Sequence, residues 1–260
     1  MGQLFIDFLA QVLFTVGVIF LCGLIISLCN RIFYANFGSH AMTVGYVTGF
    51  LGTPVHELSH ALFCVIFRHK ILKVKLFQIG EDGTLGYVSH SYNPRSLYQQ
   101  IGNFFIGIAP IVVISCILYV AAYFLLPSFT ETLFTVFADS ASLDASAVWG
   151  GLWLALKTFF GLITTWQWWV FLLIGLLLCL HMTLSLQDIK GALHGLVFLL
   201  LILLAVDFVL FFVGGTLLSD FTEIMISIGY YLVCIFSLAI FLSLIEVAVS
   251  FLLRPFFGRR

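Results

Sequence analysis

Charged residues are scarce in this sequence, and their scarcity excludes an ordinary soluble protein. Only 9% of the 260 residues are charged, whereas about 25% are charged in a typical soluble domain. Hydrophobic residues make up 62% of the chain, and a soluble fold needs more polar surface to cover its core. No basic stripe marks a surface for nucleic acid. The composition therefore indicates an integral membrane protein that contacts the lipid bilayer and does not bind nucleic acid.

The sequence also lacks any CxxC pair. All six cysteines lie within apolar runs: Cys22, Cys29, Cys64, Cys116, Cys179 and Cys234. This distribution argues against a disulfide framework and against a cysteine-based metal site. The N-terminus lacks a basic leader with a small-residue cleavage site, so we expect the first apolar run to be a retained helix.

Long apolar runs are what the sequence has instead, and many are long enough to cross a bilayer. We expect about six spans, at roughly 4–29, 42–67, 99–126, 167–187, 192–215 and 225–253. The chain is therefore expected to be an all-α polytopic membrane protein. It has no internal repeat and no separate soluble segment, which predicts one transmembrane domain over residues 1–260.

Two further segments are harder to place. Residues 148–164 are apolar, but Lys157 lies at their middle, and a mid-membrane lysine costs about 2.5–3.5 kcal/mol on insertion scales. We expect an interfacial or partly re-entrant helix there, with Trp149 and Trp153 at the headgroups. Residues 127–147 are polar and acidic, and we expect them to be a connector.

The orientation follows from counting lysine and arginine beside the spans. One set of connectors and the tail holds Arg68, Lys70, Lys73, Lys75, Arg95, Lys190, Arg254, Arg259 and Arg260. The opposite set holds only Arg31. This asymmetry predicts that both termini and the connector 68–98 lie in the cytoplasm, and we expect the cell membrane as the location.

The connector 68–98 changes its period from helical to alternating. Lysines alternate with apolar residues at 73–76, a Glu-Asp-Gly turn signal follows at 81–83, and a second extended run begins near Tyr87. We therefore expect a small membrane-associated β-hairpin, with strands at about 73–79 and 84–90.

The motif His-Glu-Leu-Ser-His at residues 56–60 carries the chemistry. His56 and His60 are four residues apart, so on a helix both project from one face and can bind the same metal ion. Zinc lowers the pKa of a bound water to about 7, and Glu57 can take its proton. The residue frequencies predict roughly 0.004 chance occurrences of this pattern in the chain. The motif therefore indicates a zinc site with hydrolytic chemistry.

Zinc hydrolases usually add a third protein ligand. The segment 181–195 offers Asp188, at the end of the expected fourth span. His181 lies about 10 Å deeper by the helical rise, and it is either a group that supports the ligands or the ligand itself. His194 is a weaker alternative, and Ser185 and Gln187 are placed to orient Asp188.

Other polar residues carry weaker signals. Asn103 lies in the first turns of the third expected span, where it either binds substrate or hydrogen-bonds another helix. Asp207 and Glu246 lie within spans, and they either pair or face a water path. The remaining histidines His40, His69 and His90 lie at connector edges, and we expect them to be solvated.

Residues 45–191 resemble the site-2 protease family of intramembrane zinc metalloproteases, specifically its compact members without a PDZ domain. The resemblance rests on HELSHA at 56–61, the hairpin-like segment, Asn103, and Asp188 followed by Gly191. It implies that His56, His60 and Asp188 bind zinc and that Glu57 is the base. It also implies a transmembrane or membrane-associated protein substrate, held as an added strand on a β element.

Other functions compete with an intramembrane zinc metalloendopeptidase. A proteolytically inactive relative that binds membrane-protein partners would have no need of Glu57. A membrane metal transporter would place polar residues along several spans, whereas this chain concentrates them at one depth. The CAAX-protease class uses Glu-x-x-x-Asp, and this sequence has no such pattern. The sequence does not indicate an oligomeric state or a particular substrate.

Overall fold

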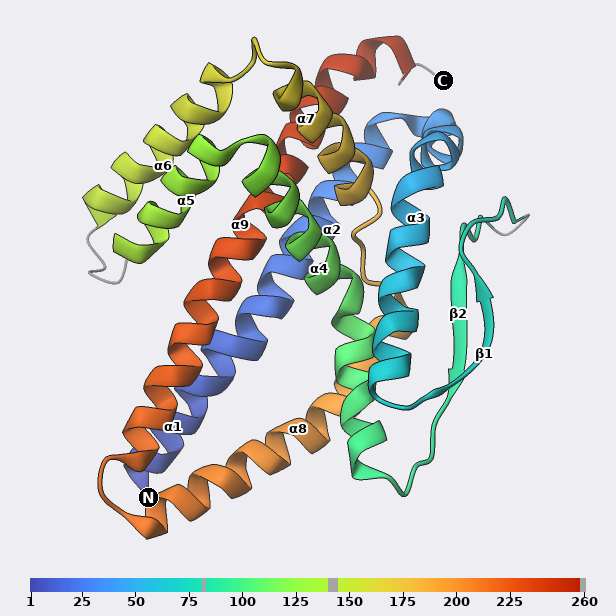
Figure 1. Ribbon diagram of the computed structural model, residues 1–260. Coiled ribbons are helices and arrows are strands. Elements are labelled where there is room, and N and C mark those ends of the chain that lie inside the picture. Colours follow the sequence, from blue (N-terminus) through green and yellow to red (C-terminus); the bar gives the residue numbers. More distant parts are fainter. Residues whose placement is uncertain (81–82, 140–144, 258–260) are drawn as a thin grey trace.

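The computed structural model describes residues 1–80, 83–139 and 145–257, and helices dominate it (Figure 1). The helices are α1 (Gly2–Val12), α2 (Val18–Asn36), α3 (Ala41–Ile66), α4 (Leu97–Leu125), α5 (Pro127–Asp139), α6 (Ala145–Gly161), α7 (Trp166–Cys179), α8 (Leu186–Val213) and α9 (Leu217–Phe257). A π-helical turn at Leu13–Gly17 joins α1 to α2 without a break. The strands β1 (Lys70–Lys75) and β2 (Tyr87–Ser91) form one small sheet. The predicted all-α fold with a hairpin is confirmed.

Several helices are long and apolar enough to cross a membrane. In the described part of the chain there are four: the continuous run Gly2–Asn36, α4, α8 and α9. The pair Gly150–Gly161 and Trp166–Cys179 is bent by 112° and forms a fifth candidate, as a broken span or a re-entrant loop. The chain is thus a multi-pass membrane protein. The predicted six spans exceed this number because α3, which matches the span predicted at 42–67, is a continuous helix but is not among those apolar enough to count as candidates.

The predicted boundary between the fourth and fifth spans is wrong. Helix α7 ends at Cys179, and α8 already begins at Leu186. The Oγ of Ser185 accepts a hydrogen bond from the Asp188 N–H at 3.1 Å, and Asp188 Oδ2 accepts one from the Ser185 N–H at 2.9 Å. This capping box starts a helix, so Asp188 lies at the beginning of a helix and not at the end of one.

The acidic segment predicted as a connector is also partly helical. Helix α5 starts at Pro127, where the missing N–H of proline is harmless because the first turn has no helical acceptor. It packs beside α6, and Figure 1 shows the two helices side by side at the edge of the molecule.

The first and last helices of the chain run parallel to each other. Gln11 Nε2 donates to Thr222 Oγ1 at 2.9 Å near their beginnings, and Asn36 Nδ2 donates to Ser250 Oγ at 2.9 Å near their ends. Figure 1 accordingly places the N-terminus at the bottom and the C-terminal end of α9 at the top. If both helices cross the bilayer once, this packing conflicts with the prediction that both termini lie on one side. The side of the membrane on which each terminus lies therefore stays a prediction.

The apolar core lies between α2, α4, α7 and α9. Its largest fully buried side chains include Ile26, Ile111, Phe171, Phe236 and Leu242. Removing such side chains from water stabilises a fold by about 1.5–3 kcal/mol each. The core therefore fixes α4, against which both α3 and α8 pack.

The hairpin is antiparallel, with Val74 opposite Val88 and Lys75 opposite Tyr87. A register shift between Ile71 and Lys73 marks an irregularity in β1. The prediction of a hairpin is confirmed, although β1 lies earlier than the predicted 73–79. Beyond the ladder the Gln78 N–H still donates to the Leu85 carbonyl at 2.7 Å. Figure 1 shows the hairpin beside α3 rather than beyond its end.

Candidate metal centre

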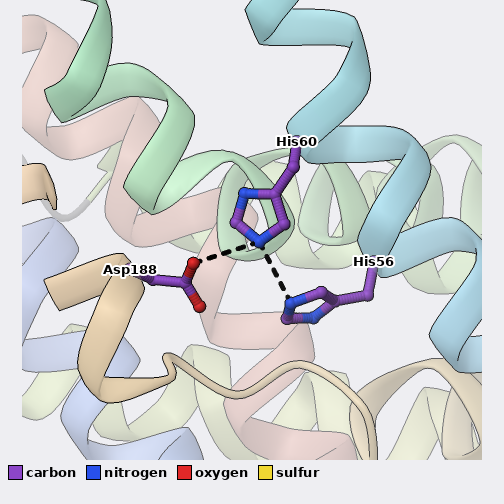
Figure 2. Close-up of side chains that lie close together, drawn as sticks. All are labelled: His56, His60 and Asp188. Carbon is purple, nitrogen blue, oxygen red and sulfur yellow. Dashed lines mark hydrogen bonds and ion pairs between the residues drawn. The ribbon is translucent and has the colours of Figure 1, made fainter. Parts of the chain in front are cut away.

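Helix α3 presents His56 and His60 on one face, as the four-residue spacing predicts. Their Nε2 atoms are 3.2 Å apart, and Figure 2 shows both rings directed toward the same point. Each ring is held by its other nitrogen. The Nδ1 of His56 lies 2.8 Å from the His181 carbonyl oxygen, and the Nδ1 of His60 lies 2.8 Å from that of Ile106.

These two carbonyls determine where the protons of the rings lie. A carbonyl oxygen only accepts hydrogen bonds, so each Nδ1 must carry the proton and donate. In neutral rings both Nε2 atoms then carry lone pairs, and the lone pairs face each other across 3.2 Å. Two lone pairs at that distance repel unless a cation lies between them. A ligating histidine that donates its other ring N–H to a backbone carbonyl is the usual arrangement at metal sites.

Asp188 completes the cluster from the first turn of α8. Its Oδ1 lies 3.3 Å from His60 Nε2 (Figure 2). Its Oδ2 accepts a hydrogen bond from the Ser185 N–H. Ligand atoms of His56, His60 and Asp188 all lie within 4.8 Å of one another. Tetrahedral zinc with bonds of about 2.0–2.2 Å separates its ligand atoms by about 3.3–3.5 Å. The donor set and two of its separations therefore suit zinc, with a fourth position left for water or substrate.

The close approach of Asp188 depends on a glycine in α4. A Cβ atom at Gly107 would collide with the backbone carbonyl oxygen of Asp188 and would lie 2.8 Å from the Cβ of Ala192. Glycine at this position therefore allows α8 to start against α4, which brings the carboxylate to the two histidines.

Glu57 and the cluster share one cavity of about 740 Å³. Its lining comes from α3, from the hairpin, from α4 and from the start of α8: His56, Glu57, His60, Gln78, Thr84, Gly86, Tyr87, Val88, Ser89, His90, Asn103, Ile106, Gly107, Ser185, Leu186, Gln187, Asp188 and Gly191. A Cβ atom at Gly86 would lie 2.8 Å from Glu57 Cγ. The hairpin thus lies directly against the proposed base.

The structure separates the alternative ligands from the cluster. The ring nitrogens of His181 lie 3.0 Å from Thr48 Oγ1 and 3.4 Å from Thr53 Oγ1, so this residue supports His56 through its backbone carbonyl instead. His194 Nε2 lies 2.9 Å from Gln100 Oε1. Of the three candidates for the third ligand, only Asp188 lies beside both motif histidines, and its role as a ligand stays a prediction.

Asn103 and Gln187 both line the cavity, as a role at the site requires. The Asn103 side chain is buried, and its Nδ2 donates to the Gln100 carbonyl within the same helix at 3.4 Å. Ser185 holds Asp188, in agreement with its predicted orienting role.

The expectation that His69 is solvated is wrong, and His90 is only partly exposed. Only 5% of His69 is exposed, and its Nδ1 lies 3.0 Å from the Nδ1 of His90, which lines the cavity. Burial lowers the pKa of both imidazoles, and for His90 the neighbouring His69 and His60 lower the pKa further. No local sequence signal indicates this contact, because it arises only when the start of β1 and the end of β2 pair.

Comparison with known proteins agrees with the geometry at a coarse level. Residues 49–157 match a family model described as "Putative zincin peptidase". The matched segment holds the HELSH motif, the hairpin and Asn103, but it ends before Asp188 and covers 109 of 260 residues. No curated protein and no solved structure matches the chain significantly. The match and the His-His-Asp cluster together support a zinc metallopeptidase.

Proposed function

We propose that this protein is an intramembrane zinc metalloendopeptidase of the site-2 protease type. The observation that carries the proposal is the pair of carbonyl-bound histidines whose Nε2 atoms face each other at 3.2 Å. Asp188 adds a carboxylate oxygen at 3.3 Å from one of them, and Glu57 lines the same cavity. A metal-binding protein without hydrolytic activity would need the three ligands but not Glu57.

His56, His60 and Asp188 would hold the zinc ion. When bound, zinc supplies a Lewis acid that polarises a substrate carbonyl and makes water more acidic. Glu57 follows His56 directly in α3, so its carboxylate can take the proton from the attacking water. The same carboxyl group can then give the proton to the amine that leaves when the C–N bond breaks.

The substrate is proposed to bind as an extended strand along β2. A transmembrane helix has all its interior peptide N–H groups hydrogen-bonded, so it must unwind before cleavage. In the described residues β2 pairs only with β1, and five consecutive residues, 86–90, line the cavity. An added strand gains main-chain hydrogen bonds and tolerates varied side chains. Asn103, which α4 contributes to the cavity lining, is proposed to bind the substrate backbone.

The orientation that we propose places the N-terminus and the connector 68–98 in the cytoplasm and the C-terminal tail on the other side. The basic connector and the parallel packing of α1–α2 with α9 support it. Single cysteines at Lys73 and Arg260, in a cysteine-free background, test it with an impermeant thiol reagent on intact cells. We expect labelling of the tail only, and protection of both sites would restore the orientation expected from charge alone.

The exchange Glu57→Gln tests the proposed function. Purified protein in lipid vesicles is incubated with a panel of Leu/Ala-rich transmembrane peptides, and products and zinc content are measured by mass spectrometry. We expect wild-type zinc content in Glu57→Gln with cleavage reduced about 100- to 10,000-fold. Glu223→Gln, a change at an exposed carboxylate, is the matched control and should cleave normally. Unchanged cleavage by Glu57→Gln would overturn the mechanism.

A further inference from the structure

A pair of histidines next to the zinc ligands has a hydrogen-bond pattern that the proposed mechanism does not use. His69 follows α3, and its Nε2 lies 2.8 Å from the Gln99 carbonyl oxygen. Its ring stacks on Tyr92 with centroids 5.2 Å apart and planes inclined by 21°. The ring is almost fully buried, and a flip of the imidazole would break its hydrogen bond to the Gln99 carbonyl.

This fixed ring determines the tautomer of its neighbour. The Gln99 carbonyl only accepts, so His69 Nε2 carries a proton. In a neutral His69 the Nδ1 is then an acceptor, and the partner at 3.0 Å is His90 Nδ1. His90 must therefore donate from Nδ1, which leaves its Nε2 with the lone pair.

Both rings are expected to be neutral in their surroundings. Burial is the main cause that lowers the pKa of each imidazole. The groups that further disfavour a proton on His90 are His69 and His60, and a zinc ion beside His60 would act in the same direction. In this neutral pair, His90, which lines the cavity, therefore carries an unprotonated Nε2 that can accept a hydrogen bond.

We propose that His90 binds substrate by accepting, at Nε2, a backbone N–H at or next to the scissile peptide bond. This inference rests on the proposed function. The substrate carbonyl is drawn to the metal, whereas the N–H of an extended peptide needs an acceptor once it leaves water. Residue 90 lies in the same run of β2 as the residues that would pair with the substrate. His69 is a positioning residue, because it acts only by setting the tautomer of His90.

A peptide and its ester analogue test the proposal. The cleavage site of a Leu/Ala-rich transmembrane peptide is first located by mass spectrometry. Esters, which lack the N–H, then replace that amide or either neighbouring amide, and kcat/KM is measured for wild type, His90→Phe and His90→Gln. We expect His90→Phe to lose about tenfold on the amide, and less than twofold on one ester. His90→Gln, which keeps an acceptor oxygen, should recover most of the loss. Equal losses on the amide and all three esters would overturn the proposal.

A second measurement is independent of cleavage. Protein labelled with ¹⁵N-histidine in detergent reports the tautomer of each ring by its nitrogen chemical shifts, with the His90→Gln spectrum as the assignment. We expect His90 as the Nδ1–H tautomer, and a mixture of tautomers in His69→Phe. A wild-type His90 in the Nε2–H form would overturn the inference even if the enzyme cleaves peptides.

If no peptide is cleaved, the proposed function fails and His90 is judged by binding. The same amide and ester peptides are titrated against zinc-loaded wild type and His90→Phe. A weaker amide complex only in His90→Phe supports the acceptor role, and equal affinities overturn it.

Discussion

The His-His-Asp cluster and the long helical bundle both bury polar side chains, but the hydrogen bonds of those side chains differ between the two regions. In the cluster each histidine has one nitrogen bonded to a carbonyl and the other directed into a cavity. In the bundle, Asp207 Oδ1 accepts from Gln11 Nε2 at 3.1 Å, between α8 and α1. Glu246 is buried in α9, and neither of its carboxyl oxygens has a hydrogen-bond partner in the described chain. Asp207 and Glu246 were one possible hydrogen-bonded pair in the sequence, but among the described residues they do not pair with each other.

The difference separates a functional polar cluster from polar groups inside a bundle. Burial alone does not mark function, since Asp207 and Glu246 are more deeply buried than Glu57. What distinguishes the cluster is that several side chains are held by other bonds so that their remaining atoms converge on one accessible point. Variants in the cluster and in the bundle test this distinction.

The largest expected effect is on zinc affinity. Asp188→Asn removes a negative charge that balances the dication, and we expect about a 1,000-fold weaker zinc complex. His181→Asn leaves the carbonyl that binds His56 in place, so it should weaken zinc by about tenfold or less. Titration of the apoprotein against a competing chelator measures both. If Asp188→Asn kept full zinc affinity and His181→Asn lost it, His181 and not Asp188 would be the third ligand.

The next effect concerns the two edges of the hairpin. Proline removes a main-chain donor, so a proline scan through residues 85–88 should lower cleavage about tenfold wherever the N–H faces an added strand. Prolines at residues 74–79, which include the end of β1 and the residues after it, are the comparison and should change cleavage by less than twofold at exposed positions. Zinc content and thermal stability are monitored throughout. Unchanged cleavage throughout both segments would reduce the hairpin to a linker.

The bundle acids should matter much less. We expect Asp207→Asn and Glu246→Gln to keep zinc content and to cleave within about twofold of wild type. Because a buried carboxyl group without partners is unfavourable, Glu246→Gln should unfold at the same temperature as wild type or a slightly higher one. Loss of cleavage with intact zinc in Glu246→Gln would show that the bundle takes part in the chemistry.

The smallest effect is a pH dependence of stability at the histidine pair. The pKa of His69 is lowered in the fold, so the unfolded chain binds more protons, and stability falls as the pH drops below about 6.5. His69→Phe should remove part of this loss. In protein freed of zinc with EDTA, we expect the decrease in Tm from pH 7.5 to 5.5 to be about 1–3 °C smaller in the variant. An identical decrease in both proteins would mean that His69 is not held neutral by the fold.

Much of this fold was predictable because apolar runs, turn signals and the HELSH spacing are local. The helix around His56 and the existence of the hairpin followed from them. The start of α8 was missed although Ser185 and Asp188 form a recognisable capping box, since the surrounding apolar run masked it. The contact of His69 with His90 and the parallel course of α1–α2 and α9 depend on long-range packing, which no local pattern encodes.

The capping box of α8 ties metal binding to the order of a helix end. One oxygen of Asp188 holds the Ser185 N–H, and the other faces His60. A ligand that binds only the ordered state stabilises it by mass action. Removal of zinc should therefore let the first turn of α8 fray, and amide hydrogen exchange at residues 186–190 should quicken while that of α4 stays slow. The part of the cavity wall formed by the start of α8 would then be ordered only when zinc is bound.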